Sequence, residues 1–331
     1  MHISLLLSVA TSAAAGKAPS TLLFYTCATK EVANQCDESF SLDQHGVANR
    51  GFSANTTTIA AGFAAGITTL FSTHDTFFRN GAGLRPDWKE AWAAVQLEID
   101  SLIRTGAIVG FFAGDELVSG GKITRAELLT CLDALAVAKA TYKQQGITLF
   151  TWANEGGEVW VEQFNASGIP ASLDVVSIDD YYMDAKGTPE SQVQGHRQWY
   201  ENTLYPLLNA EQRVFVVPGS FATRNANGPT TGRYANGNAT FCYRDAATGA
   251  VTPATCDAYM ADQANAFATW AWDDARVVGF APWHWDTRGI ADVSPYKEIG
   301  VVDMPRTKAA WKKIGARVRR AAAATGLSAS Q

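Results

Sequence analysis

The chain has 331 residues and a mass of 35.5 kDa, and its 27 Lys and Arg against 32 Asp and Glu give a formal net charge of −5. Apolar residues make up 47% of the sequence and charged residues only 18%, which excludes an intrinsically disordered chain. The acidic pI near 5.6 argues against a nucleic-acid-binding protein, because such proteins must neutralise phosphates. The 10 tryptophans favour a carbohydrate ligand, since an indole ring stacks well on a flat apolar face.

The N-terminus has the pattern of a secretory signal peptide, although no basic residue precedes its apolar run. The apolar residues 3–10 are followed by Ala13, Ala14 and Ala15, which suit a cleavage site. No later stretch reaches the ~20 continuous apolar residues of a membrane span. We therefore expect a signal peptide over residues 1–15, a secreted extracellular protein over 16–331, and no membrane contact. An ordinary N-terminal core segment is the alternative.

The five cysteines fit a secreted protein, in which disulfides are permitted. Cys27 and Cys36 are close enough in sequence to form one disulfide, and Cys242 and Cys256 to form another. Cys131 lies in an amphipathic stretch and is expected to be a buried free thiol. Three sequons that fit a glycoprotein occur at Asn55, Asn165 and Asn238.

From residue 20 onward, short apolar runs alternate with amphipathic stretches. The predicted strands lie at 21–27, 47–53, 68–73, 108–115, 147–153, 173–181, 213–218 and 277–283. The predicted helices lie at 57–65, 88–105, 125–145, 190–208 and 256–273. Strict alternation indicates a parallel sheet, and eight units in about 310 residues fit a single-domain (β/α)₈ TIM barrel. A doubly wound open sheet is the alternative. The Gly-x-Gly-x-x-Gly motif of a dinucleotide-binding fold does not follow the first predicted strand, which weakens the dinucleotide-binding form of that alternative.

Two segments differ from this pattern. Residues 222–254 are rich in Asn, Gly and Thr, and we expect them to form a long loop insertion after the seventh strand, as a lid or the wall of a sugar subsite. The last 28 residues carry seven basic side chains and no acid, so the rest of the chain has a net charge of −12. We expect these basic residues on the solvated face of a final helix, with an anionic partner as the alternative.

The fourth strand ends in two acids, and active sites of such barrels form at strand ends of this kind. Alternation along the strand places Glu116, with Phe112 and Gly114, on the side that faces the barrel interior. The neighbouring Asp115 and partial burial would raise the pKa of one of the two carboxyl groups and keep a proton available. We predict that Glu116 is a general acid; a strand-end ion pair or a helix N-cap is the alternative.

Glycoside hydrolysis requires a second carboxylate, and the sixth strand supplies two candidates. Asp179 faces inward by alternation, and Asp180 follows it at the end of the strand. A buried, hydrogen-bonded Asp that closes the barrel top is the alternative. The fifth strand ends with Asn154 and Glu155, which could bind sugar hydroxyls, and Glu155 could itself be catalytic.

The eighth strand ends in Trp283 and Trp285, which alternation places on one face at the barrel mouth. We predict that they form a platform for the apolar face of a pyranose ring, with a core Trp pair as the alternative. The other residues expected to contact a glycan are Trp152, Tyr181, Tyr182, His284 and His74.

Other chemistries have less support. His74, Asp75, His284 and Asp286 could assemble a metal site, but the chain has only five His and no His-Glu-x-x-His pattern. We therefore predict neither a metal nor another cofactor. Pro218-Gly219-Ser220 is not a Gly-x-Ser-x-Gly nucleophile elbow, which argues against an α/β-hydrolase triad.

Gly114-Asp115-Glu116 resembles the Gly-Asp-Glu at the strand-four end of family 20 hexosaminidases, and more loosely the acidic strand-four motif of family 18 chitinases. In those families the Glu is the acid/base, and the Asp orients the acetamido group of the substrate, which acts as nucleophile. The resemblance implies these roles for Glu116 and Asp115. It also implies that Tyr181 or Tyr182 matches the strand-six Tyr, and Trp283 or Trp285 the Trp that closes the sugar subsite. It covers three strand ends, and the family 20 His-x-Gly and the family 18 Asp-x-x-Asp-x-Asp-x-Glu are absent.

These observations together predict a secreted, monomeric TIM-barrel glycoside hydrolase that cleaves a polysaccharide or glycan by carboxylate acid/base catalysis. The alternative is a catalytically silent, lectin-like barrel that binds carbohydrate through the Trp platform.

Overall fold

The computed structural model describes residues 18–25, 46–79, 83–179, 187–225, 230–231, 242–286, 288–289 and 296–324. Several predictions lie outside the described residues: the signal peptide over 1–15, the Cys27–Cys36 disulfide, the sequon at Asn238, and the site residues Asp180, Tyr181 and Tyr182.

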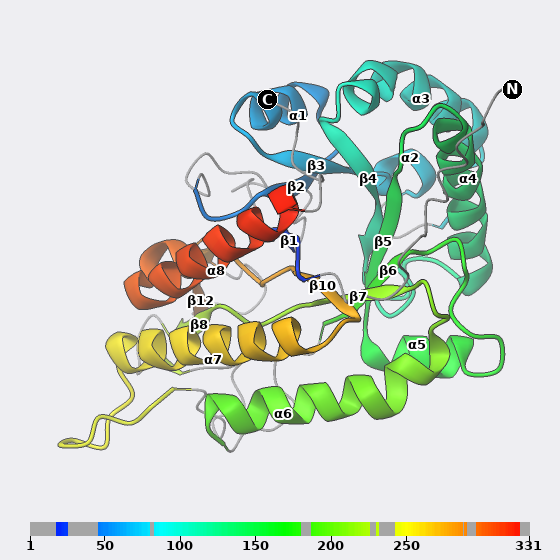
Figure 1. The fold of residues 1–331 in the computed structure, drawn as a ribbon. Coiled ribbons are helices and arrows are strands. Elements are labelled where there is room, and N and C mark those ends of the chain that lie inside the picture. Colours follow the sequence, from blue (N-terminus) through cyan, green and yellow to red (C-terminus); the bar gives the residue numbers. More distant parts are fainter. Residues whose placement is uncertain are drawn as a thin grey trace, which may run out of the picture.

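Eight parallel strands form the central sheet. They are β1 (Thr21–Leu22), β2 (Arg50–Ser53), β3 (Thr68–Ser72), β4 (Ile108–Asp115), β5 (Phe150–Glu155), β6 (Val175–Ile178), β7 (Arg213–Val216) and β10 (Val277–Phe280). Their order is β1-β10-β7-β6-β5-β4-β3-β2, so the strands from β2 to β7 pair in chain order and β10 pairs with both β7 and β1. This order is that of a nearly closed barrel, which confirms the predicted (β/α)₈ fold and excludes the doubly wound sheet (Figure 1).

The helices surround the strands (Figure 1). They are α1 (Thr56–Ala64), α2 (His74–Phe77), α3 (Trp88–Arg104), α4 (Arg125–Gln144), α5 (Gly157–Phe164), α6 (Pro189–Trp199), α7 (Pro253–Asp273) and α8 (Pro305–Ala324). All five helices predicted from the apolar pattern are present, and α6 continues as two short irregular turns, Tyr200–Leu204 and Tyr205–Leu207. The pattern missed α5, whose eight residues begin with Gly157 and follow an N-cap glycine, Gly156. No helix among the described residues combines the length and apolarity that crossing a membrane requires.

A second sheet stands beside the barrel. Its four antiparallel strands are β8 (Ala222–Asn225), β9 (Thr230–Thr231), β11 (Arg288–Gly289) and β12 (Tyr296–Ile299), in the order β11-β12-β8-β9. The segment 222–254 therefore supplies two strands to a sheet that it shares with the chain after β10. The predicted Cys242–Cys256 disulfide is present, and Cys131 is buried and free, as predicted. The disulfide joins Cys242, within the insertion, to Cys256 in the first turn of α7.

Asn49 closes the gap in the barrel between β1 and the start of β2. Its backbone N–H donates to the carbonyl oxygen of Leu22 at 3.1 Å, and its Oδ1 accepts from the backbone N–H of Leu22 at 2.8 Å. Its Nδ2 donates to the carbonyl oxygen of Ser20 at 2.9 Å. Because β1 has only two residues, the side chain of Asn49 supplies hydrogen bonds that a strand ladder would otherwise provide.

Replacing this side chain is expected to weaken the fold. Asn49→Ala leaves the N–H of Leu22 and the carbonyl of Ser20 without these partners, which should lower the free energy of unfolding by about 2 kcal/mol. Urea denaturation measures the change. The control is Asn265→Ala on α7, where the lost hydrogen bond is to Ala261 of the same helix. An Asn49→Ala protein as stable as the control would contradict this role of Asn49.

His196 is buried between α6 and α7, and we expect it to make the packing of these two helices sensitive to acid. Its side chain is buried, its ring lies 5.3 Å from that of Phe267, and its Nε2 has no hydrogen-bond partner among the described residues. Gln192 and Gln263 are buried in the same helix pair and also carry amide atoms without partners there. Burial lowers the pKa of His196 from its usual value near 6.5 to about 4.

This lowered pKa predicts a stability that depends on pH. Between pH 4 and 6.5 the unfolded chain binds a proton at residue 196 that the folded protein does not, so stability falls as the pH falls through this range. The loss should approach about 3 kcal/mol below pH 4. Urea unfolding of the wild type and of His196→Gln at pH 7 and pH 4 isolates this contribution. Equal losses in the two proteins would show that His196 does not cause the acid sensitivity.

Candidate active site

The end of β4 turns Asp115, and not Glu116, into the barrel mouth. Phe111 packs in the outer core against Trp92 and Phe112 lies in the interior, as alternation predicts. The pairing of β4 with β5 then shifts register between Phe112 and Asp115, and this irregularity breaks the alternation. The prediction that Glu116 faces the barrel interior, which assumed unbroken alternation along β4, is therefore wrong.

The backbone at Glu116 is strained. Its φ of 47° makes it the one residue other than glycine with a positive φ in the described part of the chain. Gly114, two residues earlier, allows the side chain of Leu117 to pack close to the backbone, because a Cβ at position 114 would lie 2.4 Å from Cδ1 of Leu117. The side chain of Glu116 is consequently exposed at the rim, where a ligand can reach it.

Asp115 is held by donors from two other strands. Tyr25, which follows β1, donates its hydroxyl hydrogen to Oδ1 at 3.1 Å, and Asn154 of β5 donates from Nδ2 to the same oxygen at 2.8 Å. Burial raises the pKa of Asp115, while these two hydrogen bonds and the charge of Lys122 oppose the rise. Lys122 is itself close by, because its Nζ donates to the backbone oxygen of Asp115 at 3.2 Å.

Glu116 experiences a different environment. Its pKa is raised, because protein covers part of this otherwise exposed side chain and because Asp115 and Glu155 carry negative charge nearby. The charge of Lys122 opposes this rise. The surroundings of the adjacent carboxyl groups therefore differ: Asp115 accepts two hydrogen bonds that oppose the effect of burial, whereas Glu116 is exposed. The pKa of each of the two is raised, with burial as the largest cause.

The surroundings of Tyr25 indicate that three of the predicted acids lie close to one another. Its side chain is completely buried, and its pKa is far above the usual range because of burial and because of the charges of Asp115, Asp179 and Glu116. Asp179 follows β6, so carboxylates from two strands act on one tyrosine. Tyr25 was not among the predicted site residues. Its only signal in the sequence is a polar aromatic residue near the end of the first predicted strand.

Glu155 supports the turn that follows Glu116. It is buried, and its carboxylate accepts hydrogen bonds from the backbone N–H groups of Leu117, Val118 and Ser119 at 3.0–3.2 Å, and from the hydroxyl of Ser119 at 3.0 Å. Burial raises its pKa, and these hydrogen bonds oppose the rise. The structure thus places Glu155 beneath the loop that carries the predicted acid.

Of the tryptophans expected to stack on sugar, only Trp283 has exposed surface at the mouth. Its ring is half-buried and lies 5.1 Å from that of Tyr25. Trp152 is completely buried in the barrel interior, where it stacks on Phe112 at 4.3 Å. Trp285 is also completely buried and packs outside the barrel against Phe24 at 5.1 Å. The prediction of a two-ring platform is wrong, because the alternation of β10 does not continue past Trp283.

The predicted histidines lie in different environments. His284 is completely buried and stacks on Phe221 at 5.8 Å. His74 is half-buried, and its Nδ1 lies 2.9 Å from Oδ1 of Asp75. No group of three or more His, Cys, Asp or Glu side chains in the described ranges could hold a metal ion.

The end of β7 carries no acid. Ser220 is buried, and its Oγ accepts from Nε1 of Trp311 on α8 at 3.1 Å, so it faces away from the mouth. Gly219, which pairs with Trp283, has no side chain. A nucleophilic carboxylate from this strand is therefore absent from residues 213–220.

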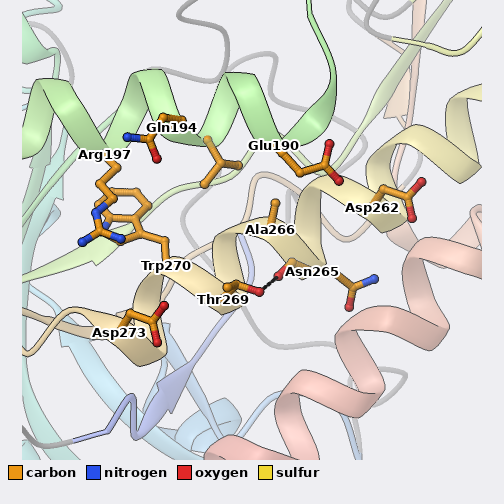
Figure 2. Close-up of a pocket in the computed structure, with 10 residues that line it drawn as sticks. Glu190, Gln194, Arg197, Asp262, Asn265, Ala266, Thr269, Trp270 and Asp273 are labelled. Atoms are coloured by element: carbon orange, nitrogen blue, oxygen red, sulfur yellow. Dashed lines mark hydrogen bonds between the residues drawn. The ribbon is translucent and has the colours of Figure 1, made fainter.

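Two hollows lie between outer helices. One, of about 320 Å³, separates α6 from α7 and is lined by residues of those helices alone, among them Arg197, Asn265 and Trp270 (Figure 2). The other, of about 400 Å³, lies beside α5 and includes Asp179 with Gly157 and Trp199. Asp179 thus lines the hollow beside α5, and its charge also acts on Tyr25.

No family model matches the sequence, and no curated protein matches it significantly. Among solved structures, the fold is similar to Bacteroides uniformis beta-glucuronidase 2, with 14% identity and a TM-score of 0.43 over 73% of this chain, which spans 27% of that protein. A GH113 beta-mannanase from Alicyclobacillus acidocaldarius shows 13% identity and a TM-score of 0.41, covering 78% of this chain and 76% of that one. A family 17 beta-1,3-glucanosyltransferase from Rhizomucor miehei shows 12% identity and a TM-score of 0.46, covering 80% and 86%. Similarity at these identities and TM-scores assigns no functional role to any residue of this chain. It also does not support the specific resemblance to family 20 or family 18.

Proposed function

We propose that the protein is a glycoside hydrolase with Glu116 as its general acid and Asp115 as its second carboxylate. The observation that supports this most is the contrast between the two neighbours. Asp115 is held by two hydrogen bonds on one oxygen, while Glu116 is exposed, and the pKa of each carboxyl group is raised. Paired carboxyl groups whose environments separate their protonation states divide into an acid and a charge-stabilising partner.

In the proposed reaction, Glu116 donates its proton to the glycosidic oxygen as the bond between that oxygen and the anomeric carbon breaks. The positive charge that develops on the sugar ring is stabilised by Asp115. Water then adds to the anomeric carbon and gives its proton to the Glu116 carboxylate, which restores the starting state. Trp283, whose half-buried ring lies next to Tyr25, would carry the sugar ring.

The end of β7 carries no acid that could attack the anomeric carbon. This favours a reaction in which Asp115 acts on a group of the substrate. The Gly114-Asp115-Glu116 motif suggests that Asp115 orients an acetamido group of the substrate, whose oxygen bonds to the anomeric carbon as the leaving oxygen departs. The water of the second step then displaces this acetamido oxygen and gives its proton to Glu116. N-acetylhexosamine glycans are therefore the first substrates to examine. Asp179, Asp180, Tyr181, Tyr182 and His74 remain proposed contacts around this centre. Secretion is supported by the predicted signal peptide and by the Cys242–Cys256 disulfide.

A reducing-end assay over a panel of N-acetylated and neutral glycans tests the proposal. We expect the wild-type protein to release reducing ends from at least one class of glycan. Saturable binding of a glycan without release of reducing ends across the panel would contradict it, and would identify a lectin-like barrel instead.

A further inference from the structure

Asp115 lies at the end of a hydrogen-bond chain that begins inside the barrel. Nε1 of Trp152 donates to Oγ of Ser177 at 2.8 Å, the Ser177 hydroxyl donates to Oδ1 of Asn154, and Nδ2 of Asn154 donates to Oδ1 of Asp115 at 2.8 Å. A carboxylate can only accept, so Nδ2 of Asn154 faces Asp115, Oδ1 of Asn154 accepts from the Ser177 hydroxyl, and the Ser177 oxygen accepts from the indole of Trp152. The amide of Asn154 is thereby oriented with its N–H toward the acid.

Tyr25 is the second donor to the same oxygen. Its ring is fixed by contacts with Phe52 at 5.3 Å, Trp152 at 6.0 Å and Trp283 at 5.1 Å. Because its pKa is raised far above the usual range, the hydroxyl stays protonated and can donate to Asp115. Complete burial also keeps it from a substrate, which excludes it as the nucleophile in this conformation.

We propose that Tyr25 and the chain Trp152–Ser177–Asn154 are positioning residues that fix Asp115 as a carboxylate, with Oδ1 bound to the protein and Oδ2 directed to the substrate. This inference rests on the proposed function. All five side chains come from β1, β4, β5 and β6 or from the residues that follow them, so the barrel itself sets the position of Asp115. No donor among the described residues reaches Oδ2.

The arrangement separates the roles of the two neighbouring acids. Hydrogen bonds to a carboxylate favour its charged form, and a chain of such bonds in a buried site is polarised along its length. The charge of Asp115 in turn raises the pKa of Glu116, so donors that favour the carboxylate at Asp115 help Glu116 to keep its proton. The positioning residues therefore determine which of the two carries the proton to the glycosidic oxygen.

The test measures the titration of Asp115 directly, by carbon-13 NMR of its side-chain carboxyl group, in the wild type and in two variants. Tyr25→Phe removes one donor and keeps the ring contacts, and Ser177→Ala releases the amide of Asn154 without touching Asp115. Each should raise the titration midpoint of Asp115, by about one pH unit for Tyr25→Phe. The acidic limb of kcat/KM should move in the same direction.

Tyr205→Phe is the matched control, because Tyr205 donates to Oδ2 of Asp274 at 2.6 Å on the outside of the barrel. It should leave Asp115 unchanged. A folded Tyr25→Phe protein and a folded Ser177→Ala protein that both keep the wild-type midpoint would overturn the inference, even if glycans are hydrolysed. A shifted midpoint in a protein that hydrolyses no glycan would support the positioning role and contradict the proposed reaction.

Discussion

Glu116→Gln is expected to lower kcat/KM on an unactivated glycan by about 10²- to 10⁴-fold while leaving the fold intact. The amide has nearly the shape of the carboxyl group, but it cannot transfer a proton to the departing oxygen. Glu116 is exposed and its pKa is raised, so it is both reachable and protonated over a wider pH range than an ordinary glutamate. The measurement is steady-state hydrolysis, with circular dichroism to confirm folding.

The choice of substrate distinguishes a general acid from a binding residue. An aryl glycoside with a good leaving group needs little protonation, so Glu116→Gln should affect it much less than the natural glycan. Glu211→Gln, an exposed glutamate on a remote turn, is the control and should retain full activity. An equal loss on both substrates would indicate that Glu116 binds the sugar and does not donate a proton.

Asp115→Asn should cause the second large loss, of about 10²- to 10³-fold in kcat. Asparagine can still accept from Tyr25 and Asn154 through its carbonyl oxygen, so the variant removes the charge and retains the geometry. The loss should appear at every pH, because no protonation restores a negative charge there.

Asp179→Asn is the comparison, because Asp179 also acts on Tyr25 but lies beside the outer hollow. A larger loss of kcat in Asp179→Asn than in Asp115→Asn would assign the second carboxylate to β6 and contradict the role given to Asp115.

The strands were predictable because each is a short apolar run with an amphipathic segment after it. All eight lie close to the predicted ranges, and the (β/α)₈ order follows from their alternation. The sequence also placed the acid pair Asp115–Glu116 at a strand end. It did not reveal which of the two turns inward, since that depends on the register shift between β4 and β5.

The remaining differences arise from contacts between distant parts of the chain. Asn49 and Tyr25 act on partners 27 and 90 residues away, and no local pattern marks them. Glu155 has the composition of a catalytic acid, but its carboxylate binds the backbone of the turn after Glu116. Trp285 lies just beyond β10, where the period of two no longer applies, and its ring enters the outer core.

A crystal structure of Glu116→Gln with a bound oligosaccharide tests the central claim most directly. It should place a sugar ring on the exposed face of Trp283, with the glycosidic oxygen within hydrogen-bond distance of the residue 116 amide and Oδ2 of Asp115 facing the ring. An oligosaccharide bound in the hollow between α6 and α7, or anywhere other than the barrel mouth, would contradict the assignment of the site.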